Sequence, residues 1–224
     1  MSRVIFSLSI PLLALIAGGC NDQHQNQSQT CSQSLSHGKP IVSIVPILDN
    51  TENDLTWNLS DELSSSIYNR LAQRDRIAIN KASQVRNKMK HLKEARYPFD
   101  PDISWVKNIF NGDQFVVFLE LVTHEEVPKQ DRKKKIALQN CSADLNMSMR
   151  IRVIDLRGNQ PCIVLQELFH DSHFIPRPFT QENFLQVAWG DDCFSISPIG
   201  LAHSAFTKEI ASRIEEYIQV ASKQ

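Results

Sequence analysis

The most constraining feature of this sequence is a strict alternation of polar and apolar side chains from Asp144 to Val153. Because successive side chains of a β-strand point to opposite faces, the pattern predicts a strand with one buried face and one solvated face. The apolar set is Leu145, Met147, Met149, Ile151 and Val153, and the polar set is Asp144, Asn146, Ser148, Arg150 and Arg152. Such a strand requires a sheet with an apolar layer against one side.

A turn signal and a second strand pattern follow this alternation. Residues 157–160 (Arg-Gly-Asn-Gln) predict a tight hairpin turn, and residues 162–169 predict the returning strand. This register places Cys162 opposite Asp155 and brings Cys141 near Pro176. Since the Cα atoms of a disulfide lie within about 7 Å of each other, the hairpin excludes a Cys141–Cys162 bond. Cys141 and Cys193 are then the candidate disulfide.

The remaining apolar patterns predict alternating strands and helices. Residues 41–48 and 115–122 are nearly continuous apolar runs, which is typical of strands buried on both faces, and Pro46 should lie near the end of the first. A helix is predicted over 59–71, capped by Thr56 or Asn58, followed by a short strand at 76–79. Three further helices are predicted: one capped by Asn80, one opened by Asp100-Pro101, and a short one within 179–189. A final helix is capped by Ser197-Pro198 and carries an apolar stripe of Ile199, Phe206, Ile210, Ile214 and Tyr217. We therefore expect an α/β fold with a single mixed sheet, a long antiparallel hairpin, helices packed on one side, and a terminal helix at the C-terminus.

The N-terminus has the form of a lipoprotein signal. Arg3 precedes an apolar run of roughly 13 residues, a length typical of a signal peptide and too short to span a membrane. The run closes on Ala17-Gly18-Gly19-Cys20, which resembles a bacterial lipobox, although lipoboxes more often carry Leu where Ala17 stands. This resemblance implies cleavage after residue 19 and lipid (including palmitate) on Cys20. An ordinary secretory signal or an uncleaved anchor are the alternatives.

Residues 20–38 then predict a lipidated cysteine and a disordered tether. The stretch is rich in Gln, Asn and Ser, so it buries too little apolar surface to fold. As a flexible coil it would span roughly 24 Å. We expect three regions: a signal peptide at 1–19, the tether at 20–38, and a periplasmic α/β domain at 39–224. Asn21 after the cysteine favours the outer membrane, periplasmic face, with the inner membrane as the alternative.

Composition argues against several classes of function. The formal net charge is −1 and the charges are intermixed, which gives no basis for a nucleic-acid partner. The basic run at 132–135 is interpreted as a solvated loop rather than a contact with lipid or cell wall. The chain has only 7 glycines and no nucleotide-binding or nucleophile-elbow motif. We expect no cofactor, no metal and no small-molecule substrate, and we predict that the protein is not an enzyme.

Three clusters contain residue types that occur in metal or catalytic sites, and we interpret them as surface or loop residues. His170-Asp171-Ser172-His173 contains metal-binding residue types, but on a strand the two rings need not converge. His124-Glu125-Glu126 is interpreted in the same way. Gly190-Asp191-Asp192 is interpreted as a loop turn. Trp57 and Trp189 are candidate contact residues, with burial in the core equally common for tryptophan.

Particular residues also resemble a known group of envelope proteins. Residues 44–51 (IVPILDNT) are similar to a shared "VxPFxNxT" start, residues 112–117 to a "GADYVV"-like segment, and residues 152–158 to an "xxVxDxxTG" hairpin. These motifs occur in lipoprotein activators of penicillin-binding proteins, in curli-secretion channel lipoproteins, and in the N-terminal domain of the Tol-system propeller protein. The chain departs from the channel proteins because it has no spare pair of alternating segments for membrane hairpins.

The resemblance implies the fold and an envelope location, and it suggests a role. Our leading hypothesis is a membrane-anchored lipoprotein that acts as a non-enzymatic protein-binding adaptor or activator, held to the membrane through lipid on Cys20. Its partner would be a periplasmic or envelope protein. The alternatives are a subunit of an oligomeric secretion structure and, less favoured, a hydrolase of envelope polymers.

Overall fold

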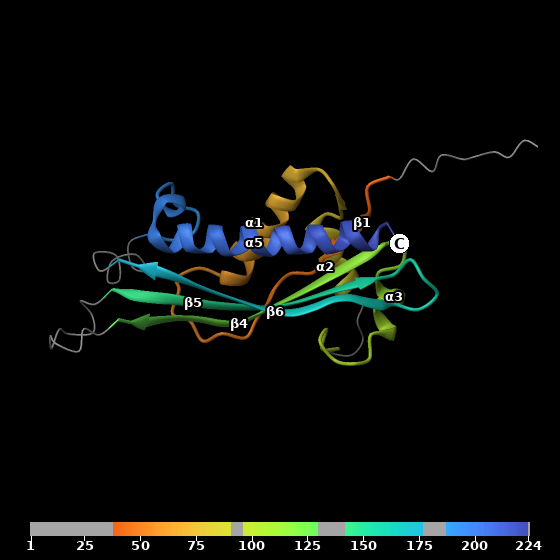
Figure 1. The fold of residues 1–224 in the computed structure, drawn as a ribbon, viewed down its shortest axis with the longest axis horizontal. Coiled ribbons are helices and arrows are strands. Elements are labelled where there is room, and N and C mark those ends of the chain that lie inside the picture. Colours follow the sequence, from red (N-terminus) through yellow and green to blue (C-terminus); the bar gives the residue numbers. More distant parts are fainter. Residues whose placement is uncertain (1–37, 91–95, 130–141, 177–186, 224) are drawn as a thin grey trace, which may run out of the picture. The chain divides into compact units, whose positions relative to one another are not determined.

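The structure, a computed structural model, describes residues 38–90, 96–129, 142–176 and 187–223 (Figure 1). The predicted signal peptide, Cys20, Cys31, most of the tether, Cys141, the basic run at 132–135 and most of the predicted helix within 179–189 lie outside the described residues. The described elements are β1 (Ile41–Ile44), β2 (Leu48–Asp49), α1 (Leu59–Arg74), β3 (Ala78–Ile79), α2 (Ala82–Lys90), α3 (Ser104–Ile109), β4 (Phe115–Pro128), β5 (Ala143–Asp155), β6 (Cys162–Ile175), the 3-10 helix η3 (Phe194–Ile196) and α5 (Pro198–Ala221).

The six described strands form one mixed sheet. Its order is β3-β1-β4-β5-β6, and β2 pairs with β4 beyond the end of β1. β1 runs parallel to β3 and β4, whereas β4, β5 and β6 are antiparallel neighbours. The predicted mixed sheet with a long antiparallel hairpin is therefore confirmed. All three strands of the meander are longer than the apolar patterns indicated, because their polar distal residues continue the pairing.

The main core lies between this sheet and the two long helices. α1 and α5 pack side by side on one face of the sheet (Figure 1), as predicted. The apolar positions of α1 are all buried, as are all five predicted apolar residues of β5. Burying each such side chain contributes about 1.5–3 kcal/mol. In α5 the stripe ends on buried Ile218, and the predicted Tyr217 is 40% exposed, because the helical repeat places position 218 under Ile214.

A second, smaller core covers part of the opposite face. Val85 of α2 and Val106 and Phe110 of the α3 region pack with Val116 and Phe118 of β4. The prediction of a fully solvated polar face on β5 is accordingly wrong at Ser148 and Arg152, which are 5% and 3% exposed. Both residues have the polarity of a surface position, but residues 98–100 cover Arg152, and Ser148 bonds with His170 of β6.

Capping residues explain where the long helices begin. The Asn58 side chain accepts a hydrogen bond from the Asp61 amide, and the Ser197 side chain accepts one from Gly200, with Pro198 at the first turn. Two other predicted caps are wrong. Asn80 instead donates to Ser43 and Asp113, and the chain after Asp100 does not become helical until Ser104.

The predicted hairpin register is confirmed at the turn. Cys162 lies opposite Asp155, although the connecting loop extends over residues 156–161 and is longer than a two-residue turn. At the other end of the hairpin, Ala143 pairs with Ile175, so a bond between Cys141 and Cys162 is incompatible with this register. Cys162 and Cys193 are exposed, and neither bonds to another described cysteine. The Cys141–Cys193 pairing stays a prediction.

Candidate functional site

The first candidate site is the interruption between β1 and β2. Both strands lie beside β4, but Pro46 has no N–H group and cannot take part in the ladder. The backbone resumes regular bonding on each side, where Val45 donates to the Val117 carbonyl and Asn50 donates to the Leu121 carbonyl. Ile47 is tied to α1, since its N–H donates to Ser64 and its carbonyl accepts from Ser60. This interruption opens the surface where the parallel strand β1 ends, a position at which α/β sheets commonly bind ligands.

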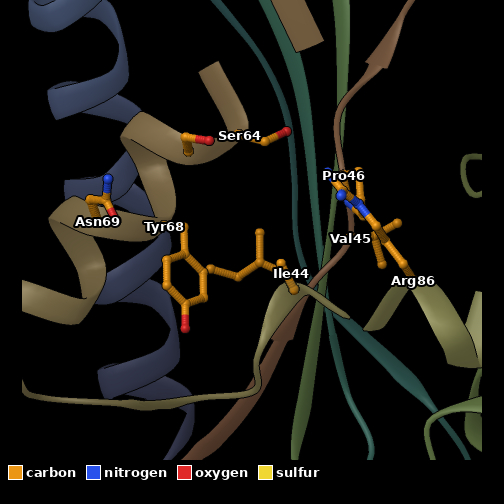
Figure 2. A pocket seen from close by; sticks show the side chains of 9 residues that line it. Ile44, Val45, Pro46, Ser64, Tyr68, Asn69 and Arg86 are labelled. Carbon is orange, nitrogen blue, oxygen red and sulfur yellow. The ribbon is translucent and has the colours of Figure 1, made fainter. Parts of the chain in front are cut away.

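A small pocket with several polar side chains lies on one side of Pro46. Figure 2 shows Ser64, Tyr68 and Asn69 of α1 on one side of the strand end and Arg86 of α2 on the other. The pocket has a volume of about 160 Å³. Arg86 is paired with Asp61 at 3.1 Å, so its charge is already partly neutralised. The lining of this pocket is mostly apolar, and hydroxyl and amide groups supply its uncharged polar part.

An apolar groove lies on the other side of Pro46. It has a volume of about 290 Å³. Its lining consists of Val45, Pro46, Leu48, Met89, Arg96, Tyr97, Pro98, Phe118 and Leu119. Leu48 and Tyr97 are 37% and 38% exposed. Pockets that receive apolar side chains have this composition, with a few polar groups at the margin. We refer to the pocket and the groove together as the Pro46 surface.

A buried carboxylate fixes the wall of the groove. Glu120 is 2% exposed and accepts hydrogen bonds from Asn50 at 2.5 Å, from Arg150 at 2.6 Å and from the Tyr97 hydroxyl. Arg150 also donates to the Tyr97 hydroxyl at 2.8 Å. Burial raises the pKa of Tyr97, and its hydrogen bond to Glu120 raises it further. The phenol is therefore protonated at neutral pH, and its hydrogen bonds hold the loop that contains Tyr97, Pro98 and Phe99 in one orientation.

The buried Arg152 holds the same loop through hydrogen bonds to its backbone. Its guanidinium donates to the carbonyl oxygens of Pro98, Phe99 and Asp100 and to the Gln166 side chain, all at 2.7–2.9 Å. Burial lowers the pKa of Arg152, and the charge of Arg150 lowers it further. The Phe99 ring lies 5.4 Å and 5.2 Å from these two guanidinium groups. The groove is thus pre-formed, because its loop has little freedom to move.

The sequence motif at residues 44–51 has a structural role at this surface. Asn50 supports Glu120, and the Thr51 amide and hydroxyl both donate to Asp49. Pro46 supplies the interruption itself. The resemblance therefore rests on residues that shape the surface, and sequence reasoning did not identify the surface because Tyr97 and Arg150 come from distant segments.

The predicted polar clusters do not form a site. His170 and His173 lie on opposite faces of β6: His170 bonds with Ser148 at 2.7 Å, and His173 lies 2.9 Å from Asp171. Asp191 accepts from the Ala188 amide in a turn where Gly190 has a φ of 104°. Across the described residues, no group of three or more His, Cys, Asp or Glu side chains is arranged to hold a metal ion.

One buried polar chain was missed by sequence reasoning. His124 Nε2 lies 3.0 Å from His203 Nε2, and His203 Nδ1 lies 2.8 Å from Glu62, which also accepts from Trp57 at 2.7 Å. When His203 Nδ1–H donates to the Glu62 carboxylate, the Nε2 atom of the neutral ring is an acceptor for a hydrogen bond from His124 Nε2–H. Burial, followed by the neighbouring His203, lowers the pKa of His124 to about 4. The interpretation of His124 as a surface residue is thus wrong, since it is 8% exposed.

The two tryptophans have different environments. Trp57 donates to Glu62 and its ring contacts Phe194 edge-on at 5.5 Å, so it belongs largely to the core. Trp189 is 39% exposed. Among the helices that the structure describes, none is long and apolar enough to cross a bilayer.

Comparisons with known proteins identify a family and a fold. The family model that matches, over residues 27–222, is described as a family of unknown function (DUF7499). No curated protein matches. Among solved structures, the chain is similar to the hypothetical protein CT253 from Chlamydia trachomatis, with 24% identity and a TM-score of 0.61 over 81% of this chain and 98% of that one.

Two further matches are more distant. Protein XCC0632 from Xanthomonas campestris has 7% identity and a TM-score of 0.49, covering 86% of this chain and 94% of that one. The lipoprotein GNA1162 from Neisseria meningitidis has 15% identity and a TM-score of 0.43, covering 77% and 99%. The likeness to the chlamydial protein shows the fold alone, and none of the three groups suggested by the sequence motifs is established by these matches.

Proposed function

The chain belongs to the family of unknown function DUF7499, and we propose that this protein is a lipid-anchored protein of the bacterial envelope that binds another envelope protein at the Pro46 surface. The observation that carries the binding role is the pre-formed apolar groove beside Pro46, with a volume of about 290 Å³. The lipid anchor rests on residues 15–20 of the sequence, which end on Cys20.

The proposed mode of binding follows from the shape of the groove. A partner would place one apolar side chain among Leu48, Met89 and Phe118. Interfaces draw most of their affinity from a few such anchors in pre-formed pockets. The fixed Tyr97 loop avoids an ordering cost on binding, since Glu120 and Arg152 already hold it. The hydroxyl and amide groups of the neighbouring pocket would form hydrogen bonds with the same partner.

The role is non-enzymatic in this proposal. The Pro46 surface offers apolar contact and hydrogen bonds, and its charged lining residues are already paired: Arg86 with Asp61, and Arg96 with Asp102. Binding and positioning need no further chemistry. The tether and lipid would hold the domain near the membrane, so that a weak interface could act at a high local concentration.

Site-directed photo-crosslinking in intact cells tests the binding role. A photoreactive residue at Leu48, which lines the groove, is expected to capture one defined envelope protein. The matched control carries the residue at Val220, which is 58% exposed on α5 and lines neither part of the Pro46 surface. Leu48→Asp is expected to reduce capture by a probe at Met89 at least 10-fold, because a carboxylate in the groove would be desolvated. Equal capture from the two positions, or capture unaffected by Leu48→Asp, would contradict the proposal.

A further inference from the structure

The outer edge of β6 is a long, regular and unpaired strand edge within the described part of the chain. β6 has 14 residues and pairs only with β5, as the last strand of the sheet order. Its one irregularity lies near the hairpin loop, opposite Val153 and Ile154. From Leu165 to Ile175 the ladder is regular. Backbone N–H and C=O groups along this outer edge are therefore available to another strand, except that the Ser172 amide donates to the Asp171 side chain at 2.9 Å.

This edge carries few of the features that prevent pairing. Between Leu165 and Ile175 there is no proline and no lysine, which are the usual protective residues of edge strands. Leu168 is 45% exposed and Phe174 is 57% exposed, and both lie on the face away from α5. An edge of this length with exposed apolar side chains is a template for strand addition.

We propose that the occupant of this edge is a second copy of the same chain, paired antiparallel through β6 about a two-fold axis at His170. His170 is the midpoint of the regular stretch from Leu165 to Ile175, so this register pairs every residue in it. The two sheets then join into one continuous sheet. A two-fold strand pairing closes on itself and gives a defined dimer rather than an open fibre.

Charge complementarity selects this register among its neighbours. About His170, Glu167 of each copy lies opposite His173 of the other, and both side chains lie on the α5 face, where Glu167 already meets Arg213 at 3.3 Å. A two-fold at Asp171 would place the two Asp171 carboxylates together. A two-fold at Phe169 would oppose Glu167 and Asp171. Like charges directly across a ladder destabilise it, whereas a carboxylate and an imidazole stabilise it.

The proposed dimer leaves the Pro46 surface free. β6 is separated from β1 and β2 by β4 and β5 in the sheet order. The dimer therefore does not depend on the proposed partner, and its experiment can fail while the Pro46 binding role stands. Two copies would present two Pro46 surfaces, one towards each outer edge of the joined sheet.

A cysteine register scan of the full chain in its own membrane tests the dimer. Cys31, Cys141, Cys162 and Cys193 are first replaced by serine, leaving Cys20. His170→Cys is then expected to form an intermolecular disulfide, because the two residues face each other across the axis. Leu168→Cys is the matched control: its two copies are offset by four positions, roughly 14 Å, and should not bond. Equal bonding at both positions, or none at His170→Cys, overturns the proposal.

A charge exchange measures the same register by affinity. Glu167→Lys and His173→Glu are each expected to weaken the dimer about 3- to 10-fold in sedimentation equilibrium of the detergent-solubilised full chain, since each change affects two symmetric contacts. The double variant E167K/H173E places opposite charges across the axis and should recover part of the affinity, because within each copy position 167 still lies beside Arg213 and position 173 beside Asp171. Circular dichroism checks that each variant is folded. Two results would refute the pairing. One is a wild-type chain that stays monomeric at 100 times the concentration at which it is present in a membrane extract. The other is a double variant that dimerises no more tightly than the single variants.

Discussion

At the residue scale, the buried chain of Trp57, Glu62, His203 and His124 is the most unusual feature of the core. Each of its ionisable members is less than 9% exposed, and together they link β4 to the first turns of α1 and α5. A buried polar network of this kind is stable only while every member keeps its partner. Protonation of His124 places a positive charge in a site that is 8% exposed, where burial and the neighbouring His203 disfavour it.

This network predicts a loss of stability in mild acid. The pKa of His124 is about 4 in the folded protein, against about 6.5 in the unfolded chain. Because the folded pKa is depressed, its stabilising contribution is complete above pH 6.5 and is lost as the pH falls towards 4, by about 3 kcal/mol. Urea unfolding at pH 7.5, 6 and 4.5 measures this loss.

The matched variant is His124→Gln, which keeps a side-chain amide able to donate to His203. Its free energy of unfolding should be lower than that of the wild type at pH 7.5 and should change less between pH 6.5 and 4.5. His170, which is partly exposed and bonds to Ser148 on the opposite face of the sheet, serves as the control through His170→Gln. A pH dependence that persists unchanged in His124→Gln would assign it to other groups.

At the scale of the elements, the junction between η3 and α5 depends on a glycine in a close contact. A Cβ atom on Gly200 would lie 1.9 Å from the Phe194 carbonyl oxygen. The Ser197 hydroxyl lies at this contact: it accepts a hydrogen bond from the Gly200 amide and donates one to the Phe194 carbonyl oxygen. The glycine thus permits the backbone of η3 to fold against the first turn of α5, which also positions His203.

We therefore predict that Gly200→Ala destabilises the protein, although alanine normally favours a helix by up to about 1 kcal/mol over glycine. The clash with backbone atoms should outweigh this gain and cost about 2–4 kcal/mol. Gly158→Ala is the control, because its Cβ would meet only Gln160 at 3.5 Å, an ordinary contact. Thermal unfolding of both variants decides the matter, and a Gly200→Ala melting temperature at or above wild type would contradict the expected clash.

Sequence reasoning succeeded for elements whose signals are local. The alternation of β5 predicted its buried face because a period of two has one meaning in a strand. Ser197-Pro198 predicted the start of α5 because a capping serine followed by proline is a local signal for the beginning of a helix. It failed at Arg152 and His124, whose residue types favour the surface, because their burial depends on the segment at 98–100 and on α5, which approach from elsewhere in the chain.

At the scale of the whole molecule, the proposed anchor makes Cys20 the residue that fixes location. Cys20→Ser should abolish incorporation of an alkyne-labelled palmitate analogue and move the protein from the membrane pellet to the soluble fraction, since attachment by acyl chains scales with the buried methylenes. Cys193→Ser, at an exposed cysteine of the folded domain, is the control and should retain the label. Label that persists in Cys20→Ser, or a wild-type protein that is soluble, would refute the lipid anchor.

The mixed character of the sheet also has a consequence for the order in which the molecule assembles. The antiparallel strands β4, β5 and β6 are neighbours in sequence, whereas β1 pairs with β4 across some seventy residues, as in Val42 with Phe115. Closing so long a loop is slow compared with forming a hairpin. During synthesis β1 emerges first, and only the short strand β3 can pair with it until β4 follows, so one edge of its apolar stretch stays unpaired during that time. Completion of the sheet at β1 is therefore the expected late step of folding, and the Pro46 surface, which β1 and β2 build, forms only with it.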